Sequence, residues 1–518
     1  MGNRKVFASL LVMFAAVAAP AQQSGRPSGS GIIVGLEYAV VDNQRIVKAM
    51  AREFAETGMP GMKLLGEAAD WGGMQRGPNL PIDFAKLDLF VREYQSSGFT
   101  ELTVALMPHS SWGSVNVGRL KSANASPKPQ FRPHFQRWIA AVVERYDGDG
   151  NADMPGLRWP VRHLEIGSEL SSYEPEPVRE YLETLKLAYE AAHRASDRVI
   201  IAHAAFLITP VNMNVRNPSE YDVVWRNTKR VDMTHNLADM RAVLDHPELF
   251  DVINFHNLGE PYEIEHVMRW LSYETSRRVY TKPVIISDTA PTSYIGWGPA
   301  TECKGSPLGI IASPATETDR CRIAAYFTKL VAGDAATLAW TRGFVAADHV
   351  QRTIIAAEQG AKLINLSFTT DLPFATSKLF RAGAGISAWG GAIKANLFAG
   401  QVTERYPLFH AIRQMITQLD GYQSIQRVAH PESRARIYRV TRRNGVMWIA
   451  WRDPQAALLP EDGEPVLEVR LDVGAPSVTI EPVITRMNQT RPAQLRVQTN
   501  AGQLSLRLTH RPVYVTAQ

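Results

Sequence analysis

The chain has 518 residues, of which 45% are hydrophobic and 21% are charged. That is an ordinary globular composition, and the length exceeds what one core usually supports, so we expect one large domain and a smaller one. The formal net charge of +5 is small for this length and no lysine- or arginine-rich run is present, which argues against a nucleic-acid partner.

The N-terminus has the pattern of a secretory signal peptide over residues 1–21. Arg4 and Lys5 form a basic start, residues 6–19 are an almost unbroken apolar run, and small residues at 19–21 suit a cleavage site. The apolar run is shorter than the roughly 20 residues of a membrane span, with an uncleaved anchor as the alternative. We therefore expect a secreted or periplasmic protein without stable membrane insertion, followed by a polar linker over residues 22–30.

A repeating pattern then begins, in which short apolar runs alternate with longer amphipathic stretches. The runs lack strict polar alternation, which is typical of parallel strands buried on both faces. Eight strand–helix units in order predict a closed (β/α)8 TIM barrel over residues 31–421. An open doubly wound sheet is the competitor, but no glycine-rich turn follows the first run. The eight runs are residues 32–36, 62–65, 102–107, 163–166, 199–202, 252–255, 284–286 and 363–368.

Three of the intervening stretches have a clear helical period. Residues 46–54 precede a stop at Gly58, residues 178–192 follow Pro177 at a first helical position, and residues 408–419 precede Gly421.

After Gly421 the pattern changes to short alternating runs separated by turn-like dipeptides such as Asn444-Gly445. This predicts a small antiparallel β-sandwich over residues 422–518. Its expected strands are residues 435–440, 446–451, 466–471, 494–497, 504–508 and 513–515.

Cys303 and Cys321 are the two cysteines of the chain. Export would allow a disulfide between them, with two free thiols as the alternative. Two cysteines cannot form a structural zinc site alone, and no sequence feature calls for a cofactor.

Two carboxylates occupy the tips of predicted barrel strands, where the reactive groups of such barrels lie. Glu169 ends the fourth strand, and Asp288 occupies the matching position of the seventh. Cleavage of a glycosidic bond needs one acid to protonate the leaving oxygen and one carboxylate to attack carbon or activate water. An isolated glutamate in a loop is more often a plain surface residue, so the case depends on the pair.

The chain resembles the clan A glycoside hydrolases, nearest to family 39 and its relatives, over roughly residues 31–518. The resemblance implies that Glu169 is the catalytic acid/base, that Asp288 is the nucleophile or, in an inverting enzyme, the base, and that His256 lies near Asp288. We expect a hydrogen bond between His256 and Asp288. The matching segments are residues 146–150, 153–157, 163–169, 180–195, 255–257, 282–288, 406–421 and 511–515.

Two residues depart from the pattern of that family. Ser168 stands where an asparagine usually binds the sugar's 2-hydroxyl, and Asp288 stands where glutamate is usual. Aspartate withdraws the carboxylate by about 1.5 Å, whereas retaining enzymes hold their carboxyls about 5–5.5 Å apart and inverting ones about 6.5–9.5 Å. The shorter side chain could favour inversion, disable the site, or be compensated by backbone shifts.

Aromatic side chains on loops after the predicted strands would suit the apolar face of a sugar ring. Ordinary packing is an equally good interpretation of each one alone. The candidates are Trp71, Trp112, Tyr173 and Trp297.

A metal site receives less support. His109, His203 and His256 fall near strand tips, but no helix carries paired histidines at ligand spacing. Asp147, Asp149, Asn151 and Asp153 alternate like the start of a calcium loop. Ala152 and Arg158 replace the glycine and glutamate that the helix–loop–helix version requires, so a turn-rich connection is favoured over a looser calcium site.

The sequence therefore predicts an exported glycoside hydrolase that acts on an oligo- or polysaccharide through Glu169 and Asp288. The alternative is a glycan-binding protein on a degenerate glycosidase barrel, which the substitutions at Ser168 and Asp288 would explain.

Overall fold

The structure is a computed structural model that describes residues 31–37, 39, 43–115, 125–170, 176–207, 217–223, 237–291, 294, 301–304, 311, 314–371 and 385–518. The predicted signal peptide, the predicted linker, Tyr173 and Trp297 lie outside the described residues, so these predictions stay as they are.

Eight parallel strands form a closed barrel in chain order, as the sequence predicts. The first and last strands pair over four residues, from Ile33 with Leu363 to Leu36 with Leu366, which completes the ring. The strands are β1 (Ile33–Leu36), β2 (Gly61–Leu64), β3 (Glu101–Leu106), β4 (His163–Glu169), β5 (Ile200–Leu207), β6 (Ile253–Asn257), β7 (Val284–Thr289) and β8 (Leu363–Leu366).

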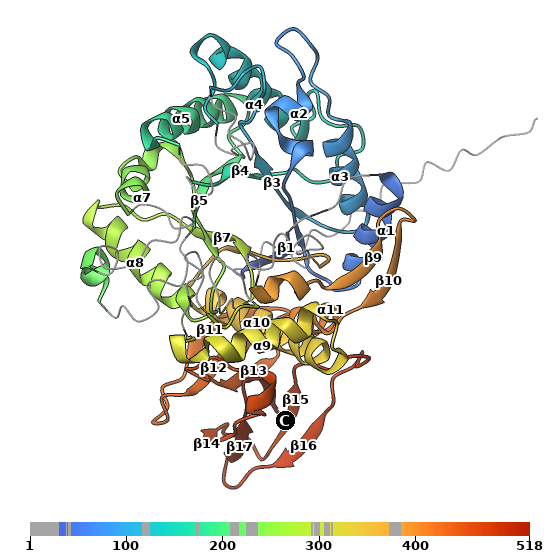
Figure 1. Cartoon of the computed structure of the whole chain (residues 1–518), viewed down its shortest axis with the longest axis vertical. Helices are drawn as coiled ribbons and strands as arrows, with labels where there is room; N and C mark the ends of the chain where they lie inside the picture. Colours follow the sequence, from blue (N-terminus) through green and yellow to red (C-terminus); the bar gives the residue numbers. More distant parts are fainter. Residues whose placement is uncertain are drawn as a thin grey trace, which may run out of the picture.

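Helices surround this ring and bury their apolar faces against it (Figure 1). The predicted periods at residues 46–54 and 178–192 lie in helices, and the period at 408–419 does so up to residue 418. The helices are α1 (Gln44–Ala55), α2 (Trp71–Met74), α3 (Ala85–Ser96), α4 (Arg132–Tyr146), α5 (Val178–Ala195), α7 (Leu237–Leu244), α8 (Glu263–Arg277), α9 (Arg320–Val331), α10 (Ala335–Glu358) and α11 (Pro407–Gln418). None of those described is long and apolar enough to cross a membrane.

The C-terminal residues form antiparallel sheets, which confirms the predicted β-sandwich. A six-stranded sheet has the order β11-β12-β13-β18-β15-β16, and β14 pairs with β17 opposite it. Strands β11 (Tyr422–Arg427) and β15 (Ser477–Pro482) and the hairpin β9 (Ile393–Asn396) and β10 (Gln401–Arg405) were not among the predicted strands. The others are β12 (Ala435–Arg442), β13 (Gly445–Arg452), β14 (Leu467–Asp472), β16 (Leu495–Gln498), β17 (Gln503–Leu508) and β18 (Val513–Ala517).

The central strands of the six-stranded sheet are buried on both faces. One face packs against β14 and β17 through a small core that includes Ile437 and Trp448. The other face contributes Tyr438 and Trp451 to the main core, where the sheet lies beneath α9, α10 and α11 (Figure 1). The Trp451 indole donates a hydrogen bond of 2.9 Å to the hydroxyl of Tyr262 in the barrel. The sandwich therefore packs against the side of the barrel.

Cys303 and Cys321 are joined by a disulfide that links the segment after β7 to α9.

Candidate active site

Glu169 is the last residue of β4 and lies at the C-terminal end of the barrel. Gly167 has a φ of 82°, a conformation that glycine adopts without strain. The ladder between β4 and β5 shifts register between Ile166 and Glu169, so strict alternation is interrupted here. Glu165 and Glu169 nevertheless approach the same imidazole, that of His256. Glu165 and Glu169 therefore lie on the same side of β4.

Asp288 lies near the end of β7 and is buried. Strand β7 carries one extra residue relative to both neighbours, because the register shifts between Phe255 and His256 on one side and between Ile286 and Thr289 on the other. One oxygen each of Glu169 and Asp288 and one ring nitrogen of His256 all lie within 4.8 Å of one another. The two carboxylates therefore approach each other as closely as those of retaining glycosidases.

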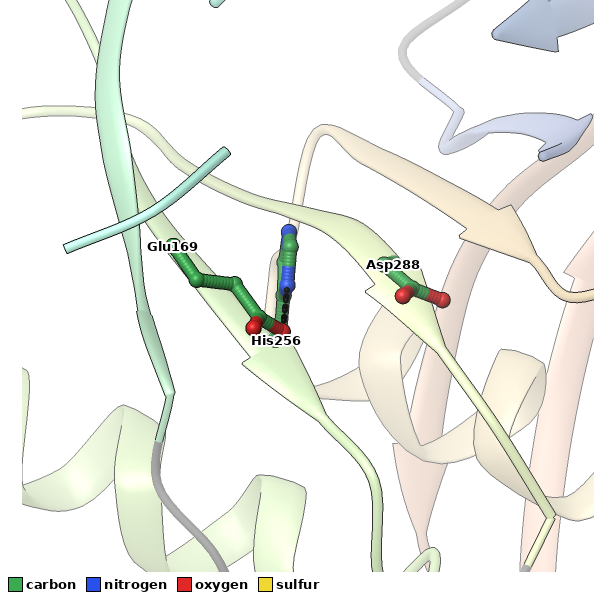
Figure 2. Close-up of side chains that lie close together, drawn as sticks. All are labelled: Glu169, His256 and Asp288. Carbon is green, nitrogen blue, oxygen red and sulfur yellow. Dashed lines mark hydrogen bonds and ion pairs between the residues drawn. The ribbon is translucent and has the colours of Figure 1, made fainter. Parts of the chain in front are cut away.

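His256 connects the acidic residues of β4 to β7. Its Nδ1 lies 2.9 Å from Glu169 Oε1, and its Nε2 lies 2.9 Å from Ser287 Oγ. Figure 2 shows the imidazole between the two carboxylates, with the hydrogen bond to Glu169 dashed. The predicted hydrogen bond to Asp288 is wrong, because both ring nitrogens bond to other residues.

The charge of His256 follows from these partners. Burial works against the charged ring, but hydrogen bonds with Glu165 and Glu169 outweigh it and raise the pKa of His256 to about 10. The ring is therefore an imidazolium at neutral pH, and both nitrogens donate.

A cluster of buried charged residues lies beside Glu169 and Asp288. Lys63, from β2, places its Nζ 3.1 Å from Glu37 Oε1 and 2.8 Å from Glu165 Oε2, and all three side chains are fully buried. The same ammonium donates a 3.0 Å hydrogen bond to the carbonyl of Ser287. Lys63 thereby ties β1, β2, β4 and β7 together under the two carboxylates.

The acids around Lys63 respond to it differently. For Glu165, burial disfavours the carboxylate, but Lys63 and His256 outweigh burial and the pKa of Glu165 is lowered. For Glu37, burial and the charge of Asp288 dominate, so the pKa of Glu37 is raised well above its ordinary value. The pKa values of the two acids therefore shift in opposite directions although they share one cation.

Glu37, Lys63, Glu165 and Ser287 were not among the predicted site residues. A usable signal was present for one of them, since Lys63 interrupts an apolar run that would otherwise read as a fully buried strand. Glu37 directly follows β1 and so lies at a strand tip. The location of Glu169 and Asp288 at strand tips was the reason for selecting those two residues.

Of the four predicted sugar-stacking aromatic residues, Trp71 and Trp112 lie in the described part of the chain. Trp71 is fully buried, and its ring lies 4.7 Å from that of Trp112 and 5.4 Å from that of Phe135. The prediction is therefore wrong for Trp71, which packs in the core. Trp112 is half-buried and donates a 2.8 Å hydrogen bond to the carbonyl of Gln75, so its role in binding stays a prediction. Ser168 is half-buried, beside Glu169 in β4.

The loop before β4 brings three acidic residues together. One oxygen each of Asp147, Asp149 and Asp153 lies within 4.8 Å of the others. The carboxylate of Asp153 accepts hydrogen bonds from the N–H groups of Gly148 and Gly150, at 3.1 and 2.8 Å. The side chain of Asn151 donates instead to Glu144, outside this group. These contacts agree with the turn-rich connection that the sequence favours.

The fold of this chain is similar to that of solved structures. No protein-family model and no curated protein matches the sequence. A family 39 glycoside hydrolase from the gut symbiont Bacteroides cellulosilyticus WH2 is similar with a TM-score of 0.58 and 12% identity, over 94% of this chain and 81% of that one. The structure of N2152 from Neocallimastix frontalis is similar with a TM-score of 0.50 and 11% identity, over 94% and 96%. The resemblance to family 39 is therefore confirmed for the fold.

Proposed function

We propose that this protein is a glycoside hydrolase of the retaining type, with Glu169 as acid/base and Asp288 as nucleophile. The observation that carries the proposal is the approach of the two carboxylates to within 4.8 Å at the tips of β4 and β7. Inverting enzymes need about 6.5–9.5 Å between these groups to admit a water molecule. The family 39 enzyme with the same fold supports the class of reaction.

The proposed reaction has two steps. In the first, the Glu169 carboxyl gives its proton to the glycosidic oxygen while Asp288 attacks the anomeric carbon, so that the carbon–oxygen bond breaks and an ester forms. In the second, Glu169 takes a proton from water, and the resulting hydroxide displaces Asp288 from the same carbon. Two displacements on one carbon restore its original configuration.

His256 stores the proton for the first step. In the free enzyme one proton lies between His256 Nδ1 and Glu169 Oε1, which are 2.9 Å apart. A leaving oxygen that approaches Glu169 draws this proton onto the carboxyl and then takes it. The hydrogen bond from His256 to Ser287 holds the ring in position during the transfer.

The test compares the wild-type protein with Glu169→Gln and Asp288→Asn on a panel of aryl glycosides and polysaccharides. Both substitutions keep the shape and remove the carboxylate, so each should abolish turnover. Glu180→Gln, at an exposed position in α5, is the matched control and should behave like the wild type. Binding of glycans without turnover by the wild-type protein would instead establish the glycan-binding alternative.

The stereochemical outcome provides a second test of the same geometry. Proton NMR of the first sugar released distinguishes the two anomers before they equilibrate. Release of the anomer present in the substrate is the expected result. Release of the opposite anomer would show that the carboxylates act as in an inverting enzyme, and would refute Asp288 as the nucleophile.

We also propose that the protein is exported after cleavage near residue 21. The apolar run at residues 6–19 supports this, and the Cys303–Cys321 disulfide suits an oxidising compartment. N-terminal sequencing of protein recovered from periplasm or medium should begin near residue 22, whereas a full-length chain in the membrane fraction would indicate an uncleaved anchor.

A further inference from the structure

Glu37 is a third acid beside the candidate site, and the proposed mechanism does not use it. It directly follows β1 and is fully buried. Its Oε1 lies 3.1 Å from Lys63 Nζ, and burial together with the charge of the nearby Asp288 carboxylate raises the pKa of Glu37. Two neighbouring carboxyl groups can form a hydrogen bond only when one of them carries a proton.

The net charge of the buried groups around Lys63 also favours a proton on one of the acids. Lys63 and His256 are the cations of this cluster, and they face the acids Glu37, Glu165, Glu169 and Asp288. Four ionised acids would leave an excess of two negative charges in a region with almost no exposed surface. A single proton on one acid halves that excess, and burial makes such neutralisation favourable.

The hydrogen-bond inventory places the proton on Glu37. Within the described part of the chain, Glu37 Oε2 and Asp288 Oδ1 are buried without a hydrogen-bond donor, whereas Glu37 Oε1 lies beside the Lys63 ammonium. Glu165 is different, because Oε1 accepts hydrogen bonds from Asn254 and Ser287, at 2.9 and 3.2 Å. A proton on Glu37 supplies the donor that Asp288 lacks, whereas Glu165 is already stabilised as a carboxylate.

We propose that Glu37 is a protonated positioning residue that donates a hydrogen bond to Asp288 and fixes the orientation of that carboxylate for attack. This inference rests on the proposed role of Asp288 as nucleophile. Lys63 contributes by fixing Glu37 through Oε1, which leaves Oε2 to carry the proton. The hydrogen bond also delocalises the charge of Asp288, which eases its departure in the second step.

The protonation of Glu37 can be tested without any activity. Infrared difference spectra between the wild-type protein and Glu37→Gln, recorded at neutral pH, should contain the carbonyl stretching band of a protonated carboxylic acid. Glu165→Gln is the matched control, since Glu165 is equally buried and contacts the same lysine. Its difference spectrum should contain carboxylate bands and no band of a protonated carboxylic acid. A Glu37 difference spectrum without the acid band would overturn the proposal.

The positioning role is tested on turnover. Glu37→Gln keeps a neutral donor and should retain most of the wild-type kcat, whereas Glu37→Leu removes the donor. The Leu variant should lose kcat on the order of 10²-fold with little change in KM, as when one preorganised donor is deleted from other active sites. Equal loss in both variants would overturn the role of the donor. A wild-type protein that hydrolyses no glycoside would refute the proposed function, while the infrared spectra would still decide the protonation of Glu37.

Discussion

Replacement of Lys63 by methionine should destabilise the protein severely. Methionine has a similar length but no charge, so the change removes the ion pair with Glu165, the contact with Glu37 and the hydrogen bond to Ser287 while the core stays filled. Glu165 then remains ionised and fully buried without its main partner. Deleting one member of a buried pair typically costs about 3–5 kcal/mol, because the charge left behind is neither solvated nor paired. That corresponds to a factor on the order of 10³ in the unfolding equilibrium.

Urea unfolding followed by tryptophan fluorescence measures this cost. Lys86→Met is the matched control, since Lys86 and Glu67 form an exposed pair at 3.8 Å, and its loss should cost less than about 1 kcal/mol. Adding Glu165→Gln to Lys63→Met should recover part of the lost stability, because the stranded charge disappears. Adding Glu37→Gln should recover little, since Glu37 is inferred to be neutral. A Lys63→Met protein as stable as the control would refute the reasoning.

Three further predictions concern stability. His256 has its pKa raised from 6.5 to about 10, so its contribution is complete below pH 6.5 and is lost as the pH rises through 10. The wild-type free energy of unfolding should fall more steeply over this window than that of His256→Gln, and equal slopes would contradict the raised pKa. Replacing Cys303 and Cys321 by serine should cost about 3 kcal/mol in the same urea assay, given their separation of 18 residues. Trp71→Ala should cost about 3–5 kcal/mol, and a negligible cost would show that Trp71 is not a core residue.

Most of the barrel could be predicted because its strands are buried on both faces and its helices on one. Helix α10 shows where this reasoning fails, since it is buried over nearly its whole length and therefore has no clear polar face to reveal a helical period. Strand β11 was missed for the opposite reason. Strand β11 places mainly polar residues at the edge of its sheet, where one buried residue, Ile425, was too weak a signal.

The site was only half predictable from the sequence. Glu169 and Asp288 could be found because strand order alone places their tips at one end of the barrel. The partner of His256 could not, because it depends on the register of β7, and the extra residue there shifts the pairing. The cluster around Lys63 joins four strands far apart in the chain. Such contacts depend on barrel closure, which no local pattern encodes.

The aspartate at position 288 is the departure from the family pattern that matters most for the chemistry. A shorter side chain on a regular strand would withdraw its carboxylate by about 1.5 Å. Here the extra residue in β7 changes the direction of the strand at its tip, and the gap to Glu169 stays within 4.8 Å. Aspartate also has fewer rotamers to restrict than glutamate, so one hydrogen bond from Glu37 suffices to orient it. The backbone and the buried acid together offer a physical account of how an aspartate can serve where glutamate is usual.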